Sequence, residues 1–352
     1  MNKKFLAGIA LVSCALAALF VAGAARSGAE STSAIMARLA LCQKVSDTEA
    51  FRECSEEPIT ELAVKVGLLE AQAVFEKSST ENNWVNCHDV MHALGRSYAQ
   101  SSPRELAKAS SPVCEGGMLD GALEERLKTA SLAEITEYGQ KYCLASLSPD
   151  MNYPSLCGHA LGHAFWLITD KNRDSALRSC SELSDGAVLQ TCAEGVFMLR
   201  YVELLERTGP SYDSVLKGLA ECDSVPLETL PACPMYAMSL ASLTTTEQIT
   251  GVINACLDLP HVAGLEFGCM TGFSQILPQA PRPLWPDTLR LCPAYRGELA
   301  NECARASLFA AVDMARERSI VDELCRAAGR DPENDKVCAS ATQWAKDTVG
   351  SS

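Results

Sequence analysis

The chain has 352 residues, of which 47% are hydrophobic, and a formal net charge of −14 at pH 7. This composition is typical of a folded globular protein and excludes a disordered chain. The acidic excess argues against nucleic acid as a partner and against a polybasic membrane-surface mode, because both need clustered Lys and Arg. The 17 cysteines exclude an ordinary reduced cytosolic enzyme, unless most of them bind metal.

Residues 1–25 predict a signal peptide or an N-terminal anchor. A short basic start precedes an uncharged and almost wholly apolar stretch from Phe5 to Ala25. Three alternatives remain open: cleavage near Ala22–Ala24, lipidation of Cys14 in a lipobox-like sequence, or an uncleaved anchor of about 20 residues. All three place the chain from residue 30 onward outside the cytoplasm, whether periplasmic, envelope-anchored or secreted. Membrane contact is then limited to this segment or to a lipid on Cys14.

The other 16 cysteines recur in a pattern. Seven pairs lie 11 to 14 residues apart, and from Cys143 onward the first cysteine of each pair recurs every 33 to 42 residues. Two cysteines remain and can pair with each other. An even number in an exported chain indicates a disulfide framework. The predicted bridges are Cys42–Cys54, Cys87–Cys114, Cys143–Cys157, Cys180–Cys192, Cys222–Cys233, Cys256–Cys269, Cys292–Cys303 and Cys325–Cys338.

A period near 36 residues predicts an array of helical hairpins. In each unit a first helix ends in Cys and a second helix begins with Cys, as in residues 175–180 followed by 192–201. One hairpin cannot bury its apolar face alone, so neighbours must stack. The predicted fold is an all-α solenoid of hairpins stapled by disulfides, with an N-terminal helical region (30–170) and C-terminal helical repeats (171–348). Four large side chains are expected in its core, namely Phe197, Met198, Met235 and Met238.

Two features of the sequence resemble a known family of repeat proteins. They are the cysteine pairs and a small residue three positions after the second cysteine, such as Gly195 and Gly272. The chain resembles the secreted, cysteine-rich Sel-like repeat proteins, which are relatives of the tetratricopeptide arrays. The likeness spans roughly residues 140–345, judged on the repeat period, with a fainter echo at Cys42 and Cys54. Its loops are longer than the usual spacing of that family. The resemblance implies an α-solenoid with a binding role.

Four of the five histidines form two pairs at i, i+4 spacing, His88 with His92 and His159 with His163. Side chains at this spacing project from one face of a helix, and paired neutral imidazoles are suited to Zn or Cu, with Fe less favoured. The sequence therefore predicts metal binding in the N-terminal half, either at one closed tetrahedral site of four histidines or with each pair taking a carboxylate and leaving an open position. Candidate carboxylates are Asp89, Glu115, Asp120 and Glu194. Asp120 lies between the histidine segments and can bridge them.

A regular solenoid would hold the two histidine pairs too far apart to share one metal ion. The two histidine helices would lie two repeats apart, roughly 20 Å at the usual spacing of packed helices. A single site then requires a tightly curled array or an irregular segment at 100–145. Otherwise the four histidines bond to nearby loop carbonyls. His261 is expected to be a solvated loop residue, and the acidic stretches 53–57 and 123–126 are expected to be solvated faces.

Two functions follow from these alternatives. The first is a metal-binding protein or metalloenzyme that uses His88, His92, His159, His163 and Asp120. The second is a protein- or glycan-binding scaffold of the cell envelope in which the histidines are structural. The sequence does not decide whether the chain is an enzyme and names no reaction or substrate.

Overall fold

A computed structural model describes most of the chain and shows a helical protein. The described residues are 31–45, 48–82, 84, 86–148, 151–241, 244–259, 263–276, 281, 284, 303–304, 307–308, 319–328 and 332–349. Within these ranges the regular structure is helical and no strand is present. The export segment, Cys14, Cys292 and His261 lie outside the described residues.

The α-helices vary in length from six to 23 residues. In chain order they are α2 (Thr32–Cys42), α3 (Thr48–Val66), α4 (Leu68–Asn82), α5 (Cys87–Tyr98), α6 (Pro103–Ala109), α7 (Gly117–Leu127), α8 (Leu132–Tyr142), α9 (Tyr153–Ile168), α10 (Arg173–Ser181), α11 (Gly186–Thr208), α12 (Tyr212–Ala220), α13 (Ala232–Ala237), α14 (Thr246–Leu257), α15 (Ala263–Ile276), α18 (Ser319–Ala328) and α19 (Pro332–Val349). Short 3-10 helices join some of them, including η1 (Val113–Gly116) and η3 (Glu221–Ser224).

Polar caps define where several helices begin. Ser131 and Glu134 form a capping box at the start of α8, and Ser102 and Glu105 form the same arrangement at α6. In each box the serine hydroxyl accepts the backbone N–H of the glutamate, while the carboxylate accepts the backbone N–H of the serine. These bonds satisfy amides that the first turn leaves without partners.

Among the described residues, seven disulfides join the hairpins, and each is a pairing predicted from the positions of the cysteines. A bridge that closes a loop of about 12 residues contributes about 3 kcal/mol to stability by the loop-entropy model. Bridges in this number indicate an oxidising, extracytoplasmic environment. Cys303 is also disulfide-bonded. The seven bridges are Cys42–Cys54, Cys87–Cys114, Cys143–Cys157, Cys180–Cys192, Cys222–Cys233, Cys256–Cys269 and Cys325–Cys338.

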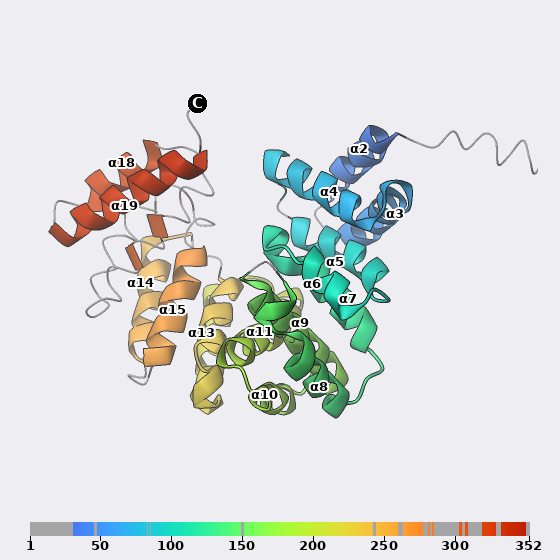
Figure 1. The fold of residues 1–352 in the computed structure, drawn as a ribbon. Helices are drawn as coiled ribbons and strands as arrows, with labels where there is room; N and C mark the ends of the chain where they lie inside the picture. Colours follow the sequence, from blue (N-terminus) through green and yellow to red (C-terminus); the bar gives the residue numbers. More distant parts are fainter. Residues whose placement is uncertain are drawn as a thin grey trace, which may run out of the picture.

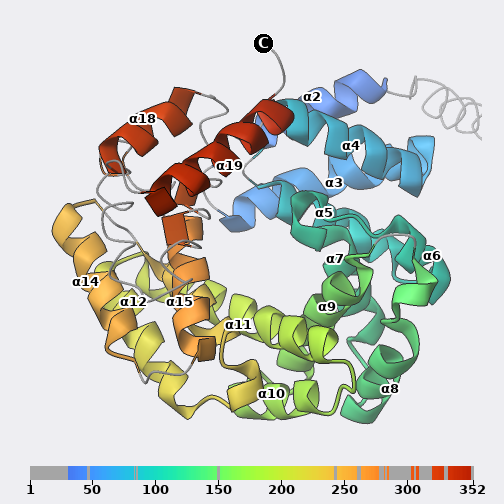
Figure 2. The ribbon, with the colours of Figure 1, turned by 60° about the vertical axis from the view of Figure 1, so that its left-hand side comes forward.

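The helices follow one another in chain order along a curve, from α2 to α19 (Figure 1). Figure 2 shows α5, α7, α9, α11 and α15 toward the centre of this curve and α6, α8, α10 and α14 toward its outside. The central helices pack directly on their neighbours, α5 on α7, α7 on α9 and α9 on α11. The second helices of successive hairpins therefore form a continuous inner layer. This layer crosses residue 170, the boundary between the two predicted regions.

Glycines allow very close packing within the inner layer. A Cβ added at Gly121 of α7 would overlap the backbone carbonyl of His92 on α5. A Cβ added at Gly162 of α9 would overlap the carbonyl of Cys192 on α11 in the same way. Only glycine permits backbones to approach this closely. The close approach matters for the site, because it brings the backbones of α5 and α7 into contact beside the histidines.

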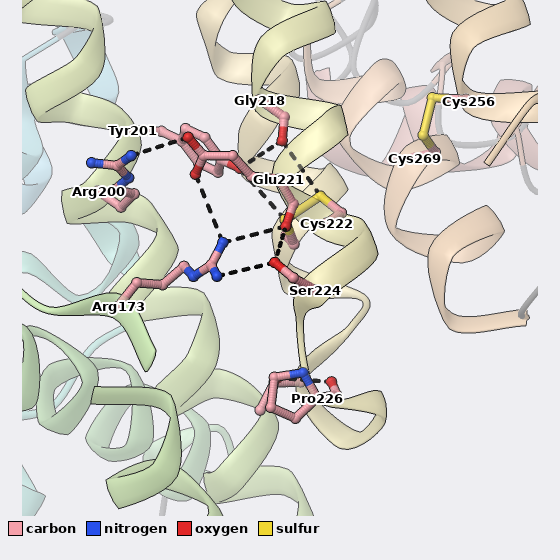
Figure 3. Close-up of a disulfide and its surroundings, with 12 residues drawn as sticks. Arg173, Arg200, Tyr201, Gly218, Glu221, Cys222, Ser224, Pro226, Cys256 and Cys269 are labelled. Carbon is pink, nitrogen blue, oxygen red and sulfur yellow. Dashed lines mark hydrogen bonds and ion pairs between the residues drawn. A yellow bond between two sulfur atoms is a disulfide. The ribbon is translucent and has the colours of Figure 1, made fainter. Parts of the chain in front are cut away.

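A polar network reinforces the outer part of the array where α10, α11 and η3 meet. Glu221 accepts from Arg200 (Nη2 to Oε1, 3.0 Å), and its backbone carbonyl accepts from Arg173 (3.3 Å). Figure 3 shows both guanidinium groups converging on Glu221, beside the bridged Cys222. Tyr201 donates its hydroxyl to the backbone carbonyl of Gly218 (3.0 Å). These contacts hold one repeat against the next.

Two further observations concern the burial of the four expected core residues and the length of the helices. Phe197 and Met238 are fully buried as expected, whereas Met198 and Met235 are only partly buried. In the part of the chain that the structure describes, no helix combines the length and the apolar character needed to cross a bilayer.

Candidate metal centre

Three helices of the inner layer bring the four paired histidines into one row. His88 and His92 lie on α5, and their ring centroids are 4.7 Å apart. His159 and His163 lie on α9, with centroids 4.9 Å apart. The two pairs meet between His92 and His163, whose centroids are 5.8 Å apart. The i, i+4 spacing within each helix places each pair on one face, as predicted.

Asp120 of α7 lies at the middle of this row. Its carboxylate Oδ2 is 3.8 Å from His88 Nε2 and 3.7 Å from His92 Nε2. Its side chain is 1% exposed. A ligand atom of Asp120 also lies within 4.8 Å of one on His159 and one on His163. Asp120 therefore bridges the two histidine helices, as its position in the sequence predicts.

Three atoms at the centre of the site are buried without a hydrogen bond. They are His92 Nε2, His163 Nε2 and Asp120 Oδ2, none of which has a hydrogen-bond partner among the described residues. A buried polar atom left in this state costs about 1–3 kcal/mol, so native structures rarely retain several together. A cation that accepts their lone pairs would satisfy all three. His/Asp groups are therefore positioned here to bind a metal.

Outer contacts fix which nitrogen each ring directs inward. His163 Nδ1 donates to Glu124 Oε1 at 2.6 Å, and the other oxygen of Glu124 lies 3.5 Å from His92 Nδ1. His88 Nδ1 donates to the backbone carbonyl of Cys114 at 2.9 Å. A ring that donates from Nδ1 keeps the lone pair on Nε2. This is the carboxylate–histidine or carbonyl–histidine arrangement that orients metal ligands.

The carboxylates and histidines shift one another's pKa values strongly. Burial would lower the pKa of His92, but the nearby carboxylates of Asp120 and Glu124 outweigh burial and raise that pKa to about 10, so a metal ion must displace a proton from this ring. Burial would raise the pKa of both carboxyl groups, yet the neighbouring histidines hold the pKa of each below its usual range. Asp120 and Glu124 are therefore ionised at neutral pH, which is the form that binds cations.

His159 is the neutral member of the row. Burial, helped by the charges of the other three histidines, lowers the pKa of His159 to about 3 against the opposing pull of Asp120. Its Nε2–H donates to the thioether of Met198 on α11 at 3.2 Å, and its ring faces that of Tyr236 at 6.4 Å. Met198 was expected in the core and instead contacts this end of the site.

The separation expected of a regular solenoid does not keep the two histidine pairs apart, because the rings of His92 and His163 meet at 5.8 Å although α5 and α9 pack on α7. The segment between the two pairs is also irregular. α6 has only seven residues, and η1 ends at Gly116 with a φ of 77° before α7 begins. Gly117 and Gly121 of α7 lie against the backbone of α5, and α9 packs on α7 as well.

The other predicted carboxylates have different positions. Asp89 forms an ion pair with Arg52 Nε at 2.9 Å and lies on the outer side of α5. Glu194 belongs to none of the groups of close ligand atoms found among the described residues. Glu115 lies in η1, and its side chain is outside the described part of the structure.

Glu124 is the residue that sequence reasoning missed, because the stretch 123–126 was expected to be a solvated face. That expectation is wrong for Glu124, whose side chain is 19% exposed and bonded to His163. It holds for Glu125, which pairs with Lys128 at the surface. A usable signal was present: Asp120 and Glu124 have the same i, i+4 spacing as each histidine pair.

Comparisons of the chain with protein-family profiles, with curated proteins and with solved structures find no match. The geometry of the site is therefore the basis for interpreting it.

Replacing Glu124 with glutamine should weaken metal binding about 10- to 100-fold. A glutamine oxygen can accept one Nδ1–H, but its amide group cannot accept the second, so one ring would lose its orientation. Competition for Zn²⁺ against a chelator of known affinity measures the change. Glu125→Gln is the matched control, since that neighbour faces solvent. Equal affinities of the two variants would show that Glu124 does not orient the ligands.

Glu194 predicts a pH dependence of stability. Burial, opposed by a hydrogen bond from Gln190, raises the pKa of Glu194 from 4.5 to about 7. The folded chain therefore holds a proton that the unfolded chain releases between these pH values. This contribution to stability is full below about pH 4.5 and is lost as the pH rises through about 7.

Glu194→Gln should therefore raise Tm relative to the parent at pH 8 and change it little at pH 5. Thermal unfolding at both pH values measures this difference. Glu206→Gln, on the exposed side of the same helix, should show no such pH-dependent difference. A Glu194→Gln effect of equal size at both pH values would contradict the assignment.

Proposed function

We propose that the chain is an extracytoplasmic metal-binding protein. The ligands of the centre are imidazole nitrogens of His88, His92, His159 and His163 and the carboxylate of Asp120. The observation that carries this proposal is the convergence of three buried atoms without hydrogen bonds, His92 Nε2, His163 Nε2 and Asp120 Oδ2. Ionised carboxylates alongside imidazoles are the donor set that divalent transition metals prefer.

The donor set suits Zn or Cu, with Fe less favoured. Imidazole binds all three ions, and one or two carboxylates are compatible with each. The thioether of Met198 accepts the Nε2–H of His159 at 3.2 Å, which leaves Nδ1 as the ligand atom of that ring. Cu is the ion to compare first with Zn, because imidazole suits both.

The rest of the chain serves as a rigid frame in this proposal. The stapled hairpins form a curved α-solenoid, and the helices after α11 act as scaffold. The N-terminal segment directs export and leaves the chain periplasmic, envelope-anchored or secreted. An envelope protein or a glycan bound by the solenoid is the alternative function if the histidines prove to be structural.

Titration of the metal-depleted, oxidised protein with Zn²⁺ and with Cu⁺ tests the proposal. We expect stoichiometric binding in the parent and its loss in the double variant His92→Gln/His163→Gln. His261→Gln, at the one histidine outside the two pairs, serves as the control and should bind like the parent. An absence of stoichiometric binding in the folded parent would reject the proposal and favour the scaffold function.

A further inference from the structure

The ligand atoms of the centre fall into two sets that share one residue. His88, His92 and Asp120 form the first set, and His159, His163 and Asp120 form the second. Within each set the ligand atoms lie within 4.8 Å of one another. Each set consists of two imidazoles and one carboxylate, which leaves open positions on a bound ion.

One ion does not reach both ends of the row. Ligand atoms on a single tetrahedral ion lie about 3.3 Å apart when the bonds are near 2.0–2.1 Å. Among the described residues, no set of mutually close ligand atoms contains both His88 and His159. A site for one ion would therefore leave at least one histidine uncoordinated. The i, i+4 spacing of that histidine from its partner would then have no role.

A third set, His92, Glu124 and His163, offers a site for one ion at the centre of the row. Its geometry opposes that use. His163 Nδ1 and Glu124 Oε1 are 2.6 Å apart, which is a hydrogen-bond distance and too short for two ligands on one ion. Glu124 is instead bonded to the outer nitrogen of His163. His92 Nε2 remains available toward Asp120 Oδ2, which is 3.7 Å away, and His163 Nε2 stays free of Glu124.

We infer that the centre holds two divalent ions side by side, bridged by the carboxylate of Asp120. His88 and His92 bind one ion, and His159 and His163 bind the other. This inference rests on the proposed function and specifies how many metal ions the protein binds. Two ions bridged in this way lie about 3.5–4 Å apart in proteins that activate water or bind phosphoryl and carbonyl oxygens.

Charge and solvent access are compatible with two ions. Two divalent ions carry more positive charge than Asp120 and Glu124 can balance. Ion-bound water loses a proton readily and supplies a compensating hydroxide. The first ion lies nearer the surface, since the side chains of His88 and His92 are 17% and 15% exposed. The second ion lies deeper, beside His163, whose side chain is fully buried.

Stoichiometry tests the inference. The metal-depleted, oxidised protein is titrated with Zn²⁺ beside two single variants, His88→Gln and His159→Gln. Both side chains are at the ends of the row and only partly buried, so folding should be retained and is checked by circular dichroism. We expect two equivalents of Zn²⁺ in the parent and one in each variant.

Cu²⁺ provides a second readout. Two Cu²⁺ ions bridged by one carboxylate should couple magnetically and lose the ordinary EPR signal of an isolated ion, which should reappear in either variant. One equivalent of Zn²⁺ in the parent would overturn the two-ion inference and leave the proposed function intact. Two equivalents retained in His88→Gln would place the second ion elsewhere and also overturn it. No binding to the folded parent would overturn the proposed function itself.

Discussion

Replacing Asp120 with asparagine is expected to weaken metal binding by more than about 100-fold, because a ligand to the ion should matter more than its outer contacts. The substitution keeps the size of the side chain and removes the negative charge that lies between the two histidine helices. Asparagine offers only a neutral amide oxygen, which is a weaker ligand than a carboxylate. The increase in Tm that Zn²⁺ gives the parent should therefore be much smaller at the same Zn²⁺ concentration, since that increase reflects binding to the folded state.

Asp89→Asn is the matched control for this loss. It makes the same chemical change on α5, between His88 and His92, at a carboxylate that pairs with Arg52 on the surface. The control should retain the Zn²⁺-dependent increase in Tm. If both variants respond to Zn²⁺ like the parent, Asp120 is not a ligand.

Replacing Gly121 with alanine is expected to destabilise the protein by about 3 kcal/mol or more and to disrupt the metal centre. Alanine in a helix interior ordinarily gains about 1 kcal/mol over glycine. Here the added Cβ overlaps the backbone carbonyl of His92, and a backbone group cannot move aside by changing rotamer. α5 and α7 must separate, which carries the histidine pair of α5 away from Asp120. Denaturant unfolding and Zn²⁺ titration measure the two effects.

Gly186→Ala provides the comparison for that experiment. Gly186 begins α11, and a Cβ added there meets no atom within 4 Å. Its unfolding free energy should change by less than about 0.5 kcal/mol. If the two variants have equal unfolding free energies, the close contact between α5 and α7 is not required for stability.

The local elements of the fold were predictable because each leaves a signal in the sequence. Cysteine spacing identified seven bridges, including Cys87–Cys114, which was assigned by elimination. Helical spacing of apolar residues identified an all-helical chain. The meeting of the two histidine pairs was not predictable, because it depends on tertiary packing of α5 and α9 on α7, including the close contact of Gly121 with the carbonyl of His92.

The site was predictable in part for the same reason. Paired histidines at i, i+4 are rare in a chain with five histidines, so they were recognised. Asp120 was recognised from its place between them. Glu124 was missed because a run of charged residues usually faces solvent, although its i, i+4 spacing from Asp120 sets it apart from Glu125.

The metal content of the exported, oxidised protein tests the central claim most directly. Elemental analysis should find Zn, Cu or Fe in stoichiometric amount in the parent, and little in the variant His88→Ala/His163→Ala, which removes one imidazole from each pair. A folded parent without stoichiometric metal, whose stability equals that of the variant, would contradict the account.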